Sequence, residues 1–154
     1  MLILLVKTLH VLSAIVFLGV GAGTAWVKLR ADRSGDPQVV AWAQRHIVQA
    51  DWIFTVPAGL AVPVTGAGLV MLYGLPWSTP WVAVGIFSFA GAGLTWLPAA
   101  WLQLRMRDDA EEALRSSQPL PPRFHRDRRT WIFLGVPSFG LTVLAVWAMV
   151  ARWP

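Results

Sequence analysis

The amino-terminal stretch constrains this chain most. Residues 1–27 are apolar or small, apart from Lys7, Thr8, His10, Ser13 and Thr24. About 20 apolar residues cross the hydrocarbon layer of a bilayer, so residues 2–27 are predicted to form a transmembrane helix, too long for a signal peptide. An ionisable side chain inside such a helix is costly and by default marks a functional site. His10 is that side chain, because Lys7 is near enough to the helix end to reach the headgroups.

Three further apolar segments are predicted to span the membrane, at about residues 52–73, 81–104 and 131–151. Asp36 and Pro37 indicate the start of an amphipathic helix at about residues 37–51, which should lie on or just above the membrane and run on into the second span. With 56% hydrophobic and only 14% charged residues, the chain is expected to be an integral membrane protein. We predict an all-α, integral membrane four-helix bundle, residues 1–154 forming one domain.

The basic residues indicate how the bundle is oriented. The segment between the first two spans holds Lys28, Arg30, Arg33 and Arg45, and the one between the last two holds Arg105, Arg107, Arg115, Arg123, Arg126, Arg128 and Arg129. The turn between the second and third spans holds none. Basic loops are typically cytoplasmic, so both termini are expected outside, in the inner (plasma) membrane of a bacterium. The net charge of +5 therefore reflects topology and contact with the lipid bilayer, not nucleic acid binding.

His10 is the strongest candidate for a functional residue. Neutral imidazole is the usual protein ligand for haem iron, so His10 could be an axial metal ligand for haem b, with Ser13 and Lys7 completing a cofactor site. The second ligand is the weak point, because the residues expected at the depth of His10 are near Thr65, Ser88 and Thr142. The structural alternative is a histidine that bonds a neighbouring helix and only contributes to packing.

Two other features leave alternatives open. Gly19 and Gly23 form a G-x-x-x-G pair, which would pack against a helix of the same chain or form a homodimer. Asp51 is expected to form a salt bridge to Arg126 or Arg129, or to join those arginines in an anion or propionate site.

Several reaction classes lack support. The chain has no cysteine, which excludes disulfides, iron–sulfur clusters and thiolate chemistry. It also has no Walker loop, nucleophile elbow or metalloprotease helix motif, so neither hydrolysis nor nucleotide chemistry is indicated. Whether the protein is an enzyme stays open.

Three short sequences carry a resemblance. They are Lys7-Thr8-Leu9-His10-Val11-Leu12-Ser13-Ala14, Lys28-Leu29-Arg30-Ala31-Asp32 and Thr65-Gly66. With them the whole chain resembles an uncharacterised bacterial family of small predicted integral membrane proteins, a domain of unknown function. More distantly, the opening is similar to HemJ-type protoporphyrinogen oxidases and CopD-like membrane proteins. The HemJ resemblance implies haem binding through His10, but it also implies a lysine in a later helix, and residues 81–104 contain none.

Two functions follow as expectations. The first is a small membrane protein that binds b-type haem through His10 for electron transfer or tetrapyrrole oxidation. The second is a non-catalytic accessory subunit or scaffold in which His10 is a packing residue. A transporter is a weaker third, because no inverted repeat or chain of acidic groups is visible.

Overall fold

The computed structural model describes residues 1–153, and all of its regular structure is helical. Its elements are α1 (Leu2–Ser34), α2 (Pro37–Ala50), the π-helical turn η1 (Asp51–Thr55), α3 (Val56–Leu72), α4 (Pro80–Ser116) and α5 (Pro122–Ala151). Because α2, η1 and α3 follow one another without a break, the chain forms four long helices. Each is long and apolar enough to cross a membrane. The prediction of an all-α membrane protein with four spanning helices is confirmed.

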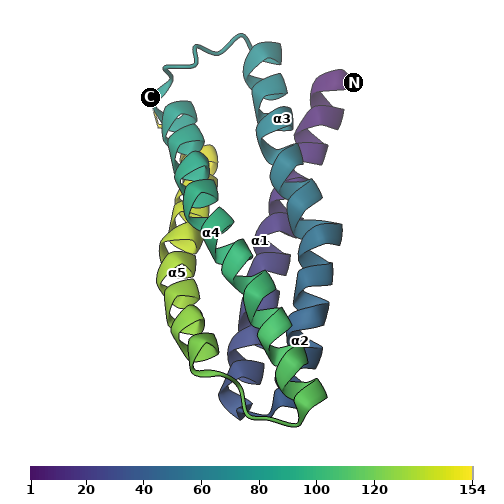
Figure 1. Ribbon diagram of the computed structural model, residues 1–154. Coiled ribbons are helices and arrows are strands. Elements are labelled where there is room, and N and C mark those ends of the chain that lie inside the picture. The colour runs from purple at the N-terminus through teal and green to yellow at the C-terminus, as the bar shows by residue number, and fades with distance from the viewer. Residues whose placement is uncertain (154) are drawn as a thin grey trace.

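The two ends of the bundle differ in what they carry (Figure 1). Both termini and the connection from α3 to α4 lie at one end, which we call the terminal end. The connections from α1 to α2 and from α4 to α5 lie at the other, which we call the basic end after the arginines around it. That the basic end faces the cytoplasm stays a prediction from charge.

The helices associate as two pairs, α1 with α3 and α4 with α5 (Figure 1). Small residues let each pair approach closely. A β-carbon at Gly59 of α3 would lie 3.0 Å from the ring of Phe17 on α1, and one at Gly91 of α4 would lie 3.1 Å from Leu141 on α5. The two pairs meet mainly where α2 packs against α4, near the basic end, and diverge toward the terminal end.

Most of the largest fully buried side chains, such as Lys28, Phe124 and Met106, lie near the basic end. One apolar cluster joins α2, α4 and the start of α5, and it comprises Val40, Ala41, Met106, Ala110, Ala113, Leu120 and Phe124. In contrast, α1 has no buried residue before Lys28. The buried part of α1 therefore lies beyond its most apolar stretch.

The helix predicted at residues 37–51 is α2, and it packs against two other helices of the bundle. Its start is as predicted, because the Asp36 side chain accepts a hydrogen bond of 2.8 Å from the Gln38 N–H and Pro37 is the first helical residue. Its apolar face is buried against α1 and α4. As expected, the helix runs on into the second span without a break, through η1 into α3. Its position at the membrane surface stays a prediction.

Candidate ligand-binding site

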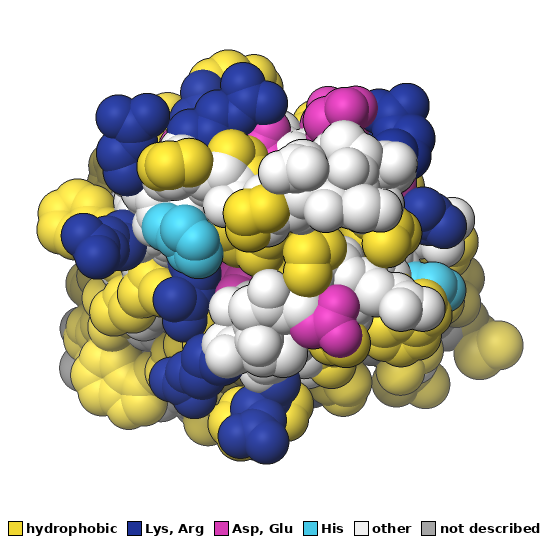
Figure 2. Space-filling view, turned by 60° about the horizontal axis from the view of Figure 1, so that its bottom comes forward, with side chains coloured by type: hydrophobic (Ala, Val, Ile, Leu, Met, Phe, Trp, Pro, Cys, Tyr) yellow, Lys and Arg dark blue, Asp and Glu magenta, His cyan; other side chains and the backbone are white. Residues whose placement is uncertain are grey.

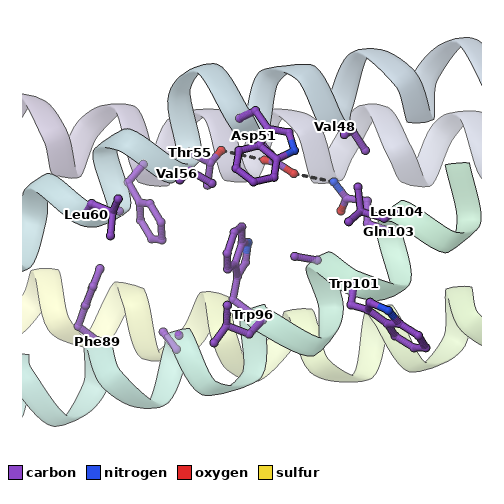
Figure 3. A pocket seen from close by; sticks show the side chains of 17 residues that line it. Val48, Asp51, Thr55, Val56, Leu60, Phe89, Trp96, Trp101, Gln103 and Leu104 are labelled. Carbon is purple, nitrogen blue, oxygen red and sulfur yellow. Dashed lines mark hydrogen bonds between the residues drawn. The ribbon is translucent and has the colours of Figure 1, made fainter.

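A cleft of about 560 Å³ lies between the α4 helix and the η1–α3 segment (Figure 3). Its walls are almost entirely apolar and rich in aromatic rings. It is lined by Phe17, Val48, Asp51, Trp52, Thr55, Val56, Gly59, Leu60, Phe89, Ala92, Gly93, Trp96, Leu97, Ala100, Trp101, Gln103 and Leu104. Trp96 projects from α4 into the space facing η1, whereas Trp101 points away from it.

One corner of the cleft is polar. The Asp51 carboxylate accepts a hydrogen bond of 2.8 Å from the Thr55 hydroxyl and one of 2.6 Å from the Gln103 side-chain amide. Gln103 is itself held in place, because its side-chain oxygen accepts a hydrogen bond of 3.0 Å from the indole N–H of Trp131. Three helical segments thereby fix the orientation of a single carboxylate beside an apolar space (Figure 3).

The π-helical turn explains how Asp51 reaches this corner. Pro57 has no N–H to donate to the carbonyl four residues earlier, and its ring crowds that carbonyl. The chain widens just before it, so that the N–H of Val56 bonds to the carbonyl of Asp51, five residues back. Such single π turns recur at functional sites in proteins. Here the widened turn carries both Asp51 and Thr55, its hydrogen-bond partner.

Asp51 differs in charge environment from the other acidic residues. Six of them form ion pairs: Asp32 with Lys28, Asp108 with Arg107, Asp109 with Arg123, Asp127 with Arg105, Glu111 with Arg45 and Glu112 with Arg115. Asp36 is exposed and caps α2. Among the described residues, Asp51 alone combines partial burial with hydrogen bonds only to neutral groups.

His10 lies closer to the terminal end and bonds α3. Its Nδ1 is 3.1 Å from the carbonyl oxygen of Val62 and 2.9 Å from the hydroxyl oxygen of Thr65. A carbonyl can only accept, so Nδ1 carries the proton and donates it. Thr65 is one of the residues expected at the depth of His10. Within residues 1–153, no side chain hydrogen-bonds to the Nε2 atom of His10.

The other residues predicted for a cofactor site are not brought to the cleft. Lys7 is exposed and Ser13 is half-buried, and neither these two nor His10 lines it. The described part of the chain also holds no group of three or more histidine and acidic side chains that could bind a metal ion. A role for these three residues with a cofactor stays a prediction.

The G-x-x-x-G pair has no partner within the described chain. A β-carbon at Gly19 or Gly23 would meet no atom within 4 Å. Packing of this pair inside the monomer, one of the two alternatives, is therefore not what the structure shows. The homodimer stays a prediction.

A cluster of buried charges lies at the basic end. The Lys28 ammonium is 2.9 Å from the Asp32 carboxylate, and both side chains are fully buried. The same carboxylate accepts a hydrogen bond of 3.1 Å from Gln44 and lies 3.7 Å from Arg128. The Lys28 ammonium also sits 4.9 Å from the centre of the Trp131 ring. This cluster holds α1, α2 and α5 together.

Two further ion pairs connect α4 with the start of α5. Arg105 forms a bidentate ion pair with Asp127, and Arg123 forms another with Asp109. Around them, exposed Lys and Arg side chains lie at the edge of the basic end (Figure 2). This distribution suits contact with anionic lipid headgroups.

The predicted salt bridge of Asp51 is wrong. Arg126 and Arg129 are exposed on α5, whereas Asp51 turns toward Thr55 and Gln103. The reason is the direction of the side chain: the π turn points it at α4, away from the basic residues that share its depth.

A protein-family model described as "Predicted integral membrane protein (DUF2269)" matches residues 4–153, nearly the whole chain. The chain belongs to this family. The DUF2269 assignment confirms the predicted resemblance and the membrane location, and its description names no activity. No curated protein and no solved structure matches the chain. The more distant similarity of this DUF2269 member to HemJ-type and CopD-like proteins stays a prediction.

Sequence reasoning missed Gln103 and the burial of Lys28 in this DUF2269 chain. Gln103 is the only amide side chain in the third apolar segment, and a single polar residue in an apolar span could have indicated a polar contact inside the bundle. The burial of Lys28 could not be predicted in this way, because a lysine next to an apolar span is ordinarily interpreted as a topology determinant.

Proposed function

We propose that this protein binds an amphipathic small molecule within the membrane, in the cleft between η1–α3 and α4. The observation that carries the proposal is a cleft of about 560 Å³ with apolar, aromatic walls and one fixed polar corner. Small-molecule sites in proteins typically have volumes of about 300–1,000 Å³ and combine apolar walls with a few placed polar groups. The apolar body of the ligand would occupy the walls, and its polar end would lie at Asp51.

The rim of the cleft supports entry from the lipid. Trp52 is 64% exposed, Leu60 65% and Leu97 61%. Large apolar side chains this exposed on membrane-spanning helices face lipid tails. A ligand dissolved in the bilayer could therefore reach the cleft sideways, without passing through water.

The test fills the cleft. Gly93 lines the cleft, and a β-carbon there would meet no atom within 4 Å, so Gly93→Leu can begin its side chain without a clash at the backbone. The probe is N-phenyl-1-naphthylamine, a neutral apolar fluorophore, added to the protein in phosphatidylcholine nanodiscs. Binding is measured as energy transfer from tryptophan, since Trp52 and Trp96 line the cleft. The signal of empty nanodiscs is subtracted.

A matched control separates cleft filling from a general effect of leucine. A β-carbon at Gly135 on α5 would also meet no atom within 4 Å, and Gly135 does not line the cleft. We expect saturable binding in the wild type and in Gly135→Leu, and affinity weakened about tenfold or more in Gly93→Leu. Equal binding in all three proteins would refute the cleft as the binding site.

A second candidate function is haem binding through His10, in electron transfer or tetrapyrrole oxidation. The observation that favours it is the bond from Nδ1 to Val62 and Thr65, which leaves Nε2 as the free basic nitrogen. Histidines that bind metals commonly donate their other ring N–H to a carbonyl in this way. Lys7 and Ser13 lie three residues before and after His10 on α1, and bound haem would supply one-electron chemistry.

The haem test is spectroscopic. Protein purified from haem-replete cells should show a Soret band that His10→Ala loses. A wild type without the band, or a mutant that keeps it in full, would favour the alternative, a non-catalytic accessory subunit or scaffold in which His10 only joins α1 to α3. For either function we place the protein in the inner membrane of a bacterium and expect no nucleic acid as a partner.

A further inference from the structure

The cleft contains one charged side chain. Among its lining residues only Asp51 is ionisable, and within residues 1–153 no lysine, arginine or histidine nitrogen lies within 4.0 Å of its carboxylate. Thr55 and Gln103 satisfy its oxygens with neutral donors, which orient the carboxyl group but supply no positive charge beside it. Charged groups buried in proteins are ordinarily paired, as Asp32, Asp109 and Asp127 are here.

Aromatic rings face the same space. Trp96 projects from α4 into the cleft toward the side that carries Asp51, and Phe89 lies on the same α4 wall, across the cleft from Leu60 (Figure 3). The rings of Phe17 and Phe89 are 5.6 Å apart and tilted, which makes a continuous aromatic surface from α1 to α4. The faces of aromatic rings attract cations, and indole does so most strongly.

We propose that the ligand of this cleft is a lipophilic organic cation, such as a quaternary ammonium or phosphonium compound with an apolar body. The inference rests on the proposed function, since it names the class of molecule that the cleft binds. Its cationic centre would pair with Asp51, and its apolar groups would lie against Phe17, Phe89 and Trp96. The pairing supplies the counter-charge that Asp51 does not find within the described chain.

The same features disfavour other ligand classes. An anion would meet the Asp51 carboxylate without any basic residue in the lining to offset the repulsion. A neutral ligand would fill the apolar walls but leave the carboxylate charge unpaired. The cleft is therefore selective for positive charge.

The experiment compares two probes of the same shape and opposite charge. Tetraphenylphosphonium and tetraphenylborate are each titrated against bound N-phenyl-1-naphthylamine in phosphatidylcholine nanodiscs, with partition into empty nanodiscs subtracted. In the wild type the phosphonium should displace the fluorophore at a concentration about tenfold or more below that of the borate. Asp51→Asn keeps the size and hydrogen-bonding capacity of the side chain and should abolish this preference.

Asp51→Glu is the charge-retaining control. It should preserve a preference for the phosphonium, because the carboxylate remains on the same turn. The neutral fluorophore should bind the wild type and Asp51→Asn with the same affinity within about twofold, since its binding depends on the apolar walls. If Asp51→Asn does not fold, the two probes on the wild type decide the question alone.

The outcomes distinguish the two proposals. If the fluorophore binds saturably and Gly93→Leu abolishes binding, but the wild type shows no preference between the probes, the cation inference is overturned and the proposed function stands. The same holds if Asp51→Asn keeps the preference. If neither the fluorophore nor tetraphenylphosphonium binds saturably, both proposals fail.

Discussion

The buried charge cluster at the basic end allows a prediction with a worked magnitude. The Asp32 side chain is fully buried and faces two cations, Lys28 at 2.9 Å and Arg128 at 3.7 Å. Asp32→Asn keeps the shape but leaves both cations without a counter-charge. Removing one member of a buried ion pair costs about 3–5 kcal/mol, and we expect the free energy of unfolding to fall by that amount.

Lys28→Met should cost less than Asp32→Asn. Asp32 then keeps Arg128 and the amide of Gln44, and the methionine side chain suits the space next to Met106 and the aromatic rings. The expected loss is about 1.5–3 kcal/mol, the range for one hydrogen bond to a charged group. In the Lys28→Met background, Asp32→Asn leaves only Arg128 unpaired, and its side chain is 25% exposed and can reach water. In that background, Asp32→Asn should therefore lower the free energy of unfolding by roughly 2 kcal/mol less than it does in the wild type.

The assay is unfolding of the purified protein by sodium dodecyl sulfate in mixed micelles, followed by circular dichroism. Asp108→Asn is the control, because its pair with Arg107 is exposed and should contribute about 1 kcal/mol or less. The reasoning is refuted if Asp32→Asn costs no more than Lys28→Met, or if the two losses add in the double variant.

Three further predictions concern other parts of the molecule. Both termini should lie outside the cytoplasm, so a periplasm-dependent reporter fused after Pro154 should be active, and cytoplasmic activity would contradict the topology. Gly19→Leu and Gly23→Leu should leave the stability of the monomer unchanged, because nothing lies within 4 Å, while loss of a detergent-resistant dimer by mass measurement would place an interface there. Gly66→Leu should reduce thermal stability, by about 1–3 kcal/mol, because a β-carbon would lie 3.2 Å from the His10 ring; unchanged melting would show that the ring moves aside freely.

The helices of this chain could be predicted from the sequence because a bilayer leaves few alternatives. Apolar length indicates each span, and the positions of the arginines align the spans in depth. That alignment placed Thr65 level with His10, and the two are hydrogen-bonded. Rotation about each helix axis is not given by depth, so the sequence could not tell which residues at one depth face one another.

Asp51 and Lys28 show this limit. Asp51 shares its depth with the basic segments, but the π turn before Pro57 rotates it toward Gln103. Lys28 is buried only because α1, α2, α4 and α5 pack around it. The local sequence around Lys28 does not predict these tertiary contacts. The residues that form the candidate cleft likewise come from α1, η1, α3 and α4. Their convergence is a property of tertiary packing.

The uneven packing along the bundle has a mechanical consequence. The α1–α3 and α4–α5 pairs are joined tightly near the basic end and diverge toward the terminal end. Each pair is therefore a lever whose fulcrum is the cluster around Phe124. Over the 24 residues from Pro80 to Gln103, α4 extends about 35 Å, so a tilt of about 5° at the fulcrum would move its far end by about 3 Å. A change in the width of the cleft, which lies close to the fulcrum, would thus be amplified at the outermost ends of the helices.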